Sequence, residues 1–460
     1  MPFHPAACAV GPQVAPEAAL HTVSVPGKIA NTQYTVPASW QPLKALGAGT
    51  YASVAAFSAP RAQPFAVKKL ERVLDHPVLA LRTLREVRLL AHFKHPNLLS
   101  IQDVFLEAGD FRDVYLCLEM MDGDLHQLIY ESSLLGPQIQ WVIYQVMRGL
   151  LCLKTAQVLH RDLTPGNVFV RANGDVKIAD LGLARAVDAE GDERDEQALT
   201  EYVVTRYYRA PEVVLTAMRY TYAVDMWSAG CILGEMLGRR PLFQGKDSLD
   251  QIRQIILCIG AQTAEDIEWL GPSGASRKFV EMCNQASDGH AFRRLSGAPG
   301  SNPLAAALLA QMLRFDPSRR IAVDDCLRHP YLEEFAADSD PEVLEARALR
   351  PVDWAFDRDL RAVLESTARP QCVDAFREAF AQARCLVAAG GASVTDVAGA
   401  ISVDSSCAGR ADARAGDQCG MAAPARVPAV EAKEGSPQRR WGRRWRCSND
   451  SQRHLSGDAD

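Results

Sequence analysis

The segment that decides the fold is His160-Arg161-Asp162-Leu163-Thr164-Pro165-Gly166-Asn167, and Asp180-Leu181-Gly182 follows it along the chain. Transfer of a phosphoryl group needs a carboxylate near the accepting hydroxyl and oxygen ligands for a metal ion beside the phosphates. Asp162 suits the first role, and Asn167 and Asp180 suit the second. An Asp and an Asn that merely cap helices would explain each segment singly, but not both in this order. The two segments therefore predict an ATP-dependent phosphoryl-transfer site that uses magnesium.

Two upstream segments supply the remaining parts of such a site. The turn Leu46-Gly47-Ala48-Gly49-Thr50-Tyr51-Ala52-Ser53-Val54 has glycines spaced so that a strand-turn-strand can close over phosphates. A glycine pair alone is more often an ordinary turn. Lys68 follows on the strand-like run Ala66-Val67-Lys68-Lys69, where its ammonium could neutralise phosphate oxygens, and Glu86 lies on a later helical pattern. Each would singly be read as a solvated surface residue, but their order ahead of Asp162 favours a nucleotide site.

Hydrophobic periodicity divides the chain into parts of different structure. Short β-prone runs between residues 34 and 119 predict a small antiparallel sheet, and apolar residues at helical spacing over 81–91 predict one helix beside it. Helical periods dominate from residue 120 to 335, at 125–129, 139–153, 223–237, 249–259 and 304–313. We expect a C-terminal extension over 336–385. We expect a disordered leader at 1–33 and a disordered tail at 386–460, because few large apolar residues there offset the entropy of ordering.

The composition excludes several classes of protein. The 460 residues carry a formal charge of −6 with 23% charged residues, without the basic excess of a dedicated nucleic-acid binder. The 12 cysteines form no C-x-x-C pair and no zinc-binding spacing. No stretch has the pattern of a signal peptide or a membrane-spanning helix. We therefore expect reduced thiols and a cytoplasmic or nuclear location.

Taken together, these segments resemble the protein-kinase signature set over about residues 46–335. Thr200-Glu201-Tyr202, followed by residues 203–212, closely resembles the activation lip and P+1 loop of mitogen-activated protein kinases of the extracellular-signal-regulated type. Further matches, to about residue 369, are R-T-L-R-E at 82–86, D-M-W-S at 225–228, H-P-Y-L at 329–332 and a helix from Leu360 that returns to the small lobe. The resemblance implies an α+β, bilobal protein kinase fold: a small antiparallel β-sheet lobe with one regulatory helix, and a larger, mainly helical lobe.

The resemblance also implies a serine/threonine kinase in intracellular signalling, with ATP and Mg²⁺ as cofactors, and it assigns site residues. The expected catalytic set is Asp162, Lys68, Glu86, Asn167, Asp180 and Thr205, of which Asn167 and Asp180 bind the metal and Thr205 bonds to Asp162. The expected ATP contacts are Leu46, Gly47, Ala48, Gly49, Thr50, Tyr51, Ala52, Ser53, Val54, Ala66, Lys68, Leu118, Glu119 and Met121. Asp225 would hold the catalytic-loop backbone, and Arg320 would pair with Glu212.

Regulation and partners are further expectations from the resemblance. A lip phosphate adds roughly −1.5 to −2 charge and attracts arginine forks. Phosphorylated Thr200 would bind Arg85, Arg161 and Arg185, and phosphorylated Tyr202 would bind Arg206 and Arg209, after an upstream dual-specificity kinase or self-phosphorylation has acted. Substrates would carry Ser or Thr followed by Pro. Docking partners would bind an acidic patch and an apolar groove, formed by Asp338, Asp340, Glu342, Leu128, Leu134 and Trp141.

Four residues depart from the family pattern: Ala52 in the glycine turn, Leu181 before the metal-loop glycine, Tyr207 in the P+1 loop, and Thr164. The first three are conservative in size or shape. Thr164 replaces the usual catalytic-loop lysine and removes a cation near the γ-phosphate. Together with Ala52 it motivates an alternative, a scaffold protein without catalysis.

Two segments remain outside the resemblance. Residues 271–300 match the family insert poorly, and we assign no site residues there. Residues 439–446 interleave arginine with tryptophan, a pattern that allows nucleic-acid or membrane contact, although a solvated tail is the preferred interpretation.

Overall fold

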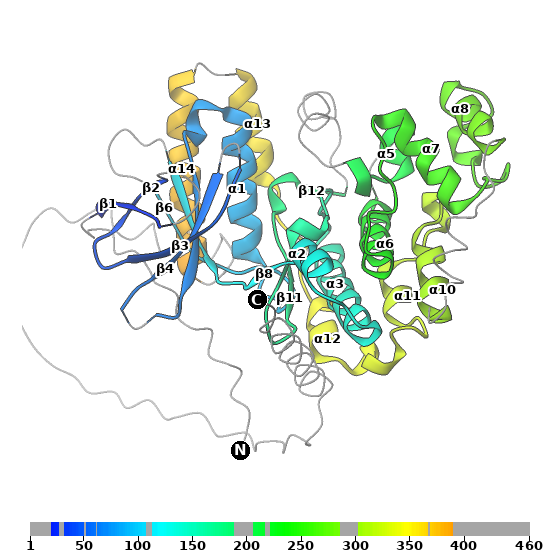
Figure 1. Cartoon of the computed structure of the whole chain (residues 1–460). Helices are drawn as coiled ribbons and strands as arrows, with labels where there is room; N and C mark the ends of the chain where they lie inside the picture. Colours follow the sequence, from blue (N-terminus) through cyan, green and yellow to red (C-terminus); the bar gives the residue numbers. More distant parts are fainter. Residues whose placement is uncertain are drawn as a thin grey trace, which may run out of the picture.

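The computed structural model describes residues 20–26, 32–49, 52–60, 62–106, 113–187, 206–216, 221–285, 302–366 and 369–389. Figure 1 shows two lobes, one built on a β-sheet with helix α1 beside it and one built mainly of helices. The α+β bilobal fold expected from the sequence is thereby confirmed.

The first lobe contains a five-stranded antiparallel sheet. Its strands lie in the order β3 (Gln41–Ala48), β4 (Ala52–Ser58), β5 (Phe65–Leu70), β7 (Val114–Glu119) and β6 (Ile101–Leu106). Side chains alternate between the two faces of a strand. In β5, Ala66 and Leu70 join the main core below the sheet, whereas Phe65 and Val67 join a second cluster on the outer face. Lys68 lies two residues from both Ala66 and Leu70, so its side chain is on the same inner face.

A hairpin covers the outer face of this sheet and corrects the expected disordered leader. Strand β1 (Leu20–Ser24) pairs antiparallel with β2 (Gln33–Pro37), so ordered structure begins before residue 34. Val25 and Tyr34 close over Trp40, and the Tyr34 hydroxyl donates to Ser53 Oγ at 2.9 Å. The short strand was missed because it buries little by itself and becomes stable only against the aromatic cluster beneath it.

Helix α1 (Pro77–His92) lies under the sheet. Pro77 opens the helix where a backbone N–H is not needed, and leucines at helical spacing turn one face into the core. The same helix carries Arg85 and Glu86, both buried. Two C-terminal helices, α13 (Ala355–Ser366) and α14 (Arg369–Ala388), return to this lobe and contact α1, as Figure 1 shows. The final helix thus continues past residue 386, the expected start of the tail, to Ala388.

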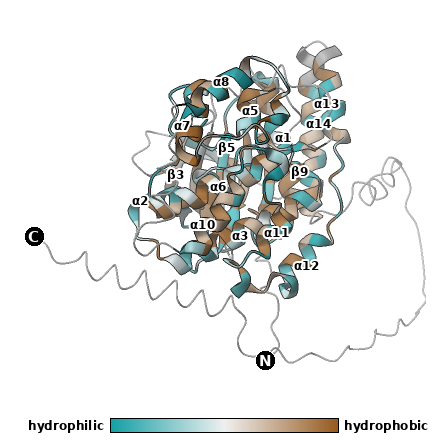
Figure 2. Ribbon diagram, turned by 90° about the vertical axis from the view of Figure 1, so that its right-hand side faces the viewer, coloured by the Kyte–Doolittle hydropathy of each residue, from teal (hydrophilic) through white to brown (hydrophobic). Residues whose placement is uncertain are grey.

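The second lobe is organised around α3 (Gly136–Thr155) and α6 (Ala223–Gly238). Helix α6 is buried along nearly its whole length, whereas outer helices such as α8 show both teal and brown in Figure 2, as expected of amphipathic helices. The five helical ranges expected from the sequence correspond to α2, α3, α6, α7 and α10. The remaining bounds are α2 (Leu125–Glu131), α5 (Pro211–Leu215), α7 (Ser248–Ile259), α8 (Ala275–Asn284), α10 (Pro303–Met312), α11 (Val323–Leu327) and α12 (Pro341–Arg347).

Short strands between the lobes position the two decisive segments. Strands β8 (Gly123–Asp124), β10 (Val168–Val170) and β11 (Val176–Ile178) form one small sheet, and β9 (Val158–Leu159) pairs with β12 (Arg185–Ala186). The catalytic loop lies between β9 and β10. Asp180 lies two residues after the end of β11, so the antiparallel β10–β11 pair brings Asn167 and Asp180 to the same end.

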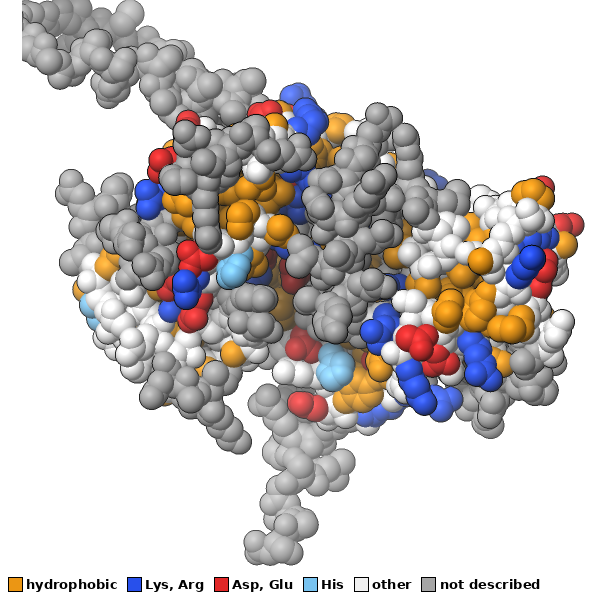
Figure 3. Space-filling model, turned by 90° about the horizontal axis from the view of Figure 1, so that it is seen from above, with side chains coloured by type: hydrophobic (Ala, Val, Ile, Leu, Met, Phe, Trp, Pro, Cys, Tyr) orange, Lys and Arg blue, Asp and Glu red, His pale blue; other side chains and the backbone are white. Residues whose placement is uncertain are grey.

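The described surface shows no single-sign field on the face seen in Figure 3, where basic and acidic side chains lie intermixed with apolar ones among the coloured residues. Among the described residues, no helix combines the length and apolar character needed to cross a bilayer.

The aromatic cluster on the outer face should dominate the stability of the first lobe. Trp40 is 3% exposed, with its ring 4.7 Å from Phe65 and 5.6 Å from Phe105 between centroids. Trp40→Ala should lower the free energy of unfolding by about 3–5 kcal/mol in chemical denaturation. Leu43→Ala, at an exposed site on β3, the strand that begins directly after Trp40, is the control and should change it by about 0.5 kcal/mol or less. Equal effects of both variants would show that the cluster is not a core.

Candidate active site

A lysine–glutamate pair joins the sheet to helix α1. Lys68 Nζ donates to both carboxylate oxygens of Glu86 at 2.8 Å. Burial works against the charged form of Lys68, but Glu86 and then Asp180 outweigh it and raise its pKa to about 12. The ammonium is therefore charged, held in place by Glu86 and close to Asp180. This geometry is what a phosphate-binding lysine requires.

The catalytic loop is fixed by bonds to its backbone. Asp225 on α6 accepts from the backbone N–H of His160 at 2.8 Å and of Arg161 at 2.9 Å. Arg161 has φ 70°, in the left-handed region that costs a non-glycine residue energy. Because both Asp225 oxygens are engaged at this point, the strained turn is held by the surrounding structure. The expected role of Asp225 is consistent with these two bonds.

Asp162 lies at the centre of the loop with its carboxylate oriented by Asn167. The Asn167 side-chain amide donates to the Asp162 backbone carbonyl at 2.8 Å and to Asp162 Oδ2 at 3.2 Å. Burial, and then the charge of Asp180, raise the pKa of Asp162 to about 6, against opposing contributions from His160, Asn167 and Arg209. A carboxylate with this pKa is a good proton acceptor near neutral pH.

Asp180 and Asn167 form an oxygen donor set. Ala179 N–H donates to the Asn167 carbonyl at 2.9 Å, which ties the two loops together, and the Asn167 amide nitrogen is engaged with Asp162. The Asp180 carboxylate accepts from Gly182 N–H at 3.4 Å through Oδ1. The atoms that could ligate a metal ion here are the amide oxygen of Asn167 and the carboxylate of Asp180. No cluster of three His, Cys, Asp or Glu side chains capable of holding a metal occurs in the described ranges. One carboxylate, one amide oxygen and substrate phosphates suit a magnesium-type ion, which needs no all-protein cage.

The nucleotide-facing residues are only partly described, because Thr50 and Tyr51 lie outside the described residues. Gly49 N–H donates to the Ala52 carbonyl at 2.7 Å, which closes the turn. Ala66, Leu118 and Met121 line the inner core, and Leu46, Gly47, Ala48 and Val54 lie on the paired strands β3 and β4. The Glu119 side chain bonds instead to Arg171 and Lys177, at 2.7 and 2.9 Å.

One expected ATP contact needs correction. The Ser53 side chain lies on the outer face of β4, where it accepts from Tyr34. Because side chains alternate along a strand, Ser53 can face a nucleotide below the sheet only through its backbone.

The arginines expected to bind the lip phosphates are divided between two places. Thr200, Tyr202 and Thr205 themselves lie outside the described residues. Arg185 lies close to Arg85, because burial and then the charge of Arg85 lower the pKa of Arg185. Arg161 contributes to the lowered pKa of both groups. Arg206 donates to the Lys246 carbonyl at 3.1 Å, and the charge of Arg209 acts on Asp162.

The structure adds two residues to the arginine cluster that the sequence did not suggest. These residues are Asp357 and Arg361, both on helix α13. Asp357 accepts from Arg361 and from Arg85, which is one of the arginines expected to bind the lip phosphate. On the amphipathic helix α13 these charged residues look like solvated positions, and no local sequence signal distinguishes them.

The acidic residues expected to form a docking patch are all engaged by arginines of the same chain. Asp338 pairs with Arg328 at 3.0 Å and Arg347 at 3.3 Å, and Arg148 pairs with Asp340 at 3.4 Å and Glu342 at 3.2 Å. The apolar residues expected beside the patch differ in exposure. Leu128 and Leu134 are half-buried, whereas Trp141 is 4% exposed and donates from its ring to the Gly174 carbonyl at 3.1 Å. Trp141 therefore belongs to the core, which corrects its expected place in an open groove.

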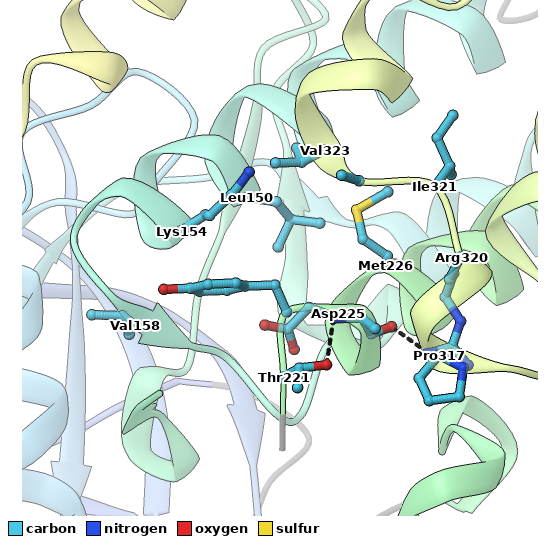
Figure 4. Close-up of a pocket in the computed structure, with 13 residues that line it drawn as sticks. Leu150, Lys154, Val158, Thr221, Asp225, Met226, Pro317, Arg320, Ile321 and Val323 are labelled. Atoms are coloured by element: carbon cyan, nitrogen blue, oxygen red, sulfur yellow. Dashed lines mark hydrogen bonds between the residues drawn. The ribbon is translucent and has the colours of Figure 1, made fainter. Parts of the chain in front are cut away.

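A cavity of about 220 Å³ lies behind the catalytic loop, between α3, α6 and the segment before α11. Figure 4 shows Asp225 and Arg320 among its lining residues. Arg320 bonds to both carboxylate oxygens of Glu212, at 2.7 and 3.0 Å, and to the Ala223 carbonyl at 2.6 Å. The guanidinium also lies 5.0 Å from the ring centroid of Trp227. These bonds hold helix α5, which follows the P+1 loop, against α6.

Comparison with known proteins identifies relatives that match most of the two-lobed part of the chain. A model of the protein kinase domain matches residues 40–332. Mitogen-activated protein kinase 2 of Arabidopsis thaliana is 43% identical over 305 residues, which cover 65% of this chain and 79% of that protein. The mitogen-activated protein kinase homolog NTF3 of Nicotiana tabacum is 42% identical over 303 residues, with 65% and 79% covered. Extracellular signal-regulated kinase 1 of Dictyostelium discoideum is 42% identical over 334 residues, with 72% and 62% covered.

The raised pKa of Asp162 predicts an acid limb in the pH profile. Only the ionised carboxylate can accept a proton. The value of kcat/KM for the nucleotide should therefore be constant above about pH 6 and fall as the pH drops through about 6. In kcat, which reports the complex with nucleotide and metal, the limb should lie lower because the metal offsets the charge of Asp180. Steady-state kinetics across this range would measure both values. A kcat/KM limb near the ordinary Asp pKa of about 4 would contradict the geometry.

Proposed function

The chain belongs to the protein kinase family as a mitogen-activated protein kinase of the extracellular-signal-regulated type, and from this membership we propose that its phosphoryl transfer depends on Lys68, Glu86, Asp162, Asn167 and Asp180. It is an ATP-dependent serine/threonine protein kinase that acts in signalling. One observation carries the proposal. Asp180 raises the pKa of both Lys68 and Asp162, and the N–H of Ala179 just before it donates to the Asn167 carbonyl at 2.9 Å, so groups from the sheet, catalytic loop and metal loop are neighbours.

The residues divide the chemistry among them. Bound ATP supplies the γ-phosphoryl group, and a divalent ion, which we propose is Mg²⁺, offsets its charge. Asn167 and Asp180 would hold that ion. Lys68, positioned by Glu86, would bind phosphate oxygens. Asp162 would orient the Ser or Thr hydroxyl and accept its proton at the carboxylate oxygen that Asn167 does not occupy.

Regulation by the lip is proposed from the arrangement of its arginines. Burial and then Arg85, Arg161 and Arg361 lower the pKa of Arg185 to about 7, which indicates a cluster with more positive than negative charge. Such a cluster favours an added anion, and phosphorylated Thr200 is the proposed one. We further propose that the P+1 loop selects proline after the phosphorylated residue, and that the protein works in the cytoplasm or nucleus; both rest on family membership.

Docking by basic partner segments is proposed with a qualification from the geometry. Arg148, Arg328 and Arg347 already occupy the acidic patch, so a partner's cations must compete with them. A partner that also offers a carboxylate to the displaced arginines would compete better than a purely basic segment.

The alternative of a scaffold without catalysis is motivated by Thr164 and Ala52. Against it, the lysine, both proposed metal ligands and the proton acceptor are present in workable geometry. Phosphorylation of myelin basic protein with ATP and Mg²⁺ decides between the two. Activity that disappears in Asp180→Ala and Asp162→Asn supports the kinase mechanism, whereas an inactive wild type with normal nucleotide binding supports the scaffold.

The lip proposal predicts a low basal rate without phosphate. The double variant Thr200→Ala/Tyr202→Phe should keep only basal turnover, because the arginine cluster then lacks the anion that organises it. Mass spectrometry of the wild type before and after incubation with ATP and Mg²⁺ would establish its phosphorylation state for the comparison. A double variant as active as the doubly phosphorylated wild type would refute the switch.

Thr164 predicts an enzyme that is slowed but active. Loss of one preorganised donor costs about 2.7–4 kcal/mol of transition-state stabilisation, which is roughly a hundredfold to a thousandfold in rate. Thr164→Lys should therefore raise kcat with little change in the KM for ATP, because the charge acts mainly on the transition state. Thr164→Met introduces a side chain of about the length of lysine but without charge. It is the matched control and should give no increase in kcat. An unchanged rate in Thr164→Lys would mean that a neighbouring cation already supplies the charge.

A further inference from the structure

Asp357 on helix α13 provides a carboxylate inside the proposed phosphate-binding cluster. Arg85 donates to Asp357 Oδ1 from Nε at 3.0 Å and from Nη2 at 2.5 Å. Arg361, one turn further along α13, donates to the other oxygen at 2.8 Å. The Arg85 side chain is fully buried and that of Asp357 is 8% exposed. Two guanidinium groups therefore share one buried carboxylate.

This carboxylate is strongly favoured in its charged form. Burial opposes ionisation, but Arg85, Arg361 and Arg185 together hold the pKa of Asp357 below its ordinary value. Arg85 and Arg185 are two of the three arginines proposed for phosphorylated Thr200. Asp357 thus lies among the cations that a lip phosphate would contact, and it supplies part of the negative charge that such a phosphate would bring.

Arg85 connects this carboxylate to the catalytic groups. On α1 it directly precedes Glu86, whose carboxylate holds Lys68. Its third nitrogen, Nη1, donates to the Gly182 carbonyl in the metal loop at 3.1 Å. The position of Arg85 is therefore coupled both to the lysine–glutamate pair and to the loop that carries Asp180. Removing one partner from a buried ion pair leaves an uncompensated charge, which is strongly unfavourable.

The fold holds Asp357 in place from both lobes. Ahead of α13, Val352 N–H donates to the Ala156 carbonyl at the end of α3 at 3.0 Å, and Asp357 N–H donates to the Trp354 carbonyl at 3.1 Å. Phe356 packs under the Arg88 guanidinium on α1, 5.2 Å from the ring centroid. Figure 1 shows α13 and α14 beside α1.

We propose that Asp357 is a positioning residue, an internal carboxylate that holds Arg85 and helix α1 in the catalytic arrangement before the lip is phosphorylated. The inference rests on the proposed roles of Lys68 and Glu86. Through Arg85, it connects helix α13 to the helix that carries Glu86 and to the metal-loop carbonyl of Gly182. Phosphorylation then adds a second anion to the cluster instead of supplying the first.

The test uses the full chain after phosphatase treatment. Asp357→Asn keeps the shape of the side chain and removes its charge, and it should lower basal kcat about 2- to 30-fold, the range typical of residues that couple two elements. The KM for the protein substrate should stay unchanged. Asp357→Glu, which restores the charge on a longer stem, should recover part of the rate. Asp359→Asn, at an exposed position on the same helix, is the matched control and should have no effect.

A further variant separates positioning from general loss of structure. If Asp357→Asn only damages folding, a new anion on the lip cannot restore it, whereas Asp357→Asn/Thr200→Glu should regain basal turnover if the charge on Arg85 matters. A basal kcat of Asp357→Asn equal to that of the wild type would overturn the proposal. A basal kcat above that of the wild type would also overturn it, and would show that Asp357 competes with the phosphate. So would failure of both Asp357→Glu and the Thr200→Glu combination to recover any rate. Full activity of Lys68→Arg would instead refute the proposed site, independently of Asp357.

Discussion

The constraint on which the rest of the structure depends is the clamp between Asp225 and the catalytic loop. A buried carboxylate on the most enclosed helix, α6, accepts from two consecutive backbone amides, at His160 and Arg161. Those bonds hold Arg161 in the left-handed conformation, and the turn that results places Asp162 beside Asn167. The site geometry therefore depends on the core of the second lobe, and a loop supported only by its own contacts would not hold this strained turn.

Buried charges link parts of the chain that are far apart in sequence. Arg85 and Asp357, Arg320 and Glu212, and Lys68 and Glu86 each join two elements across the fold. A buried ion pair adds little net stability compared with apolar packing, but it strongly penalises any arrangement that separates its members. Their common effect is to fix the relative positions of helices, strands and loops around the site.

The sequence predicted the catalytic segments well because their chemistry requires particular residues in a particular order. Asp162, Asn167, Asp180, Lys68 and Glu86 are brought together, and the long helices follow from their hydrophobic period. Strand β1 was missed because its stability comes from the aromatic cluster under it. Trp141 and Ser53 were misplaced because exposure and strand face depend on tertiary packing. Asp357 could not be found, since its partner Arg85 lies 272 positions away and nothing in the intervening sequence pairs them.

The internal pairing of the acidic residues proposed as a docking patch has a kinetic consequence. Three carboxylates facing three arginines at 3.0–3.4 Å produce a field of mixed sign that cancels within a short distance of the surface. Such a surface does little to steer an oppositely charged partner through solution, so encounter rates there should depend only weakly on ionic strength. Partner selection at this patch would then occur after contact, through short-range exchange of ion pairs, and would appear mainly in the lifetime of the complex.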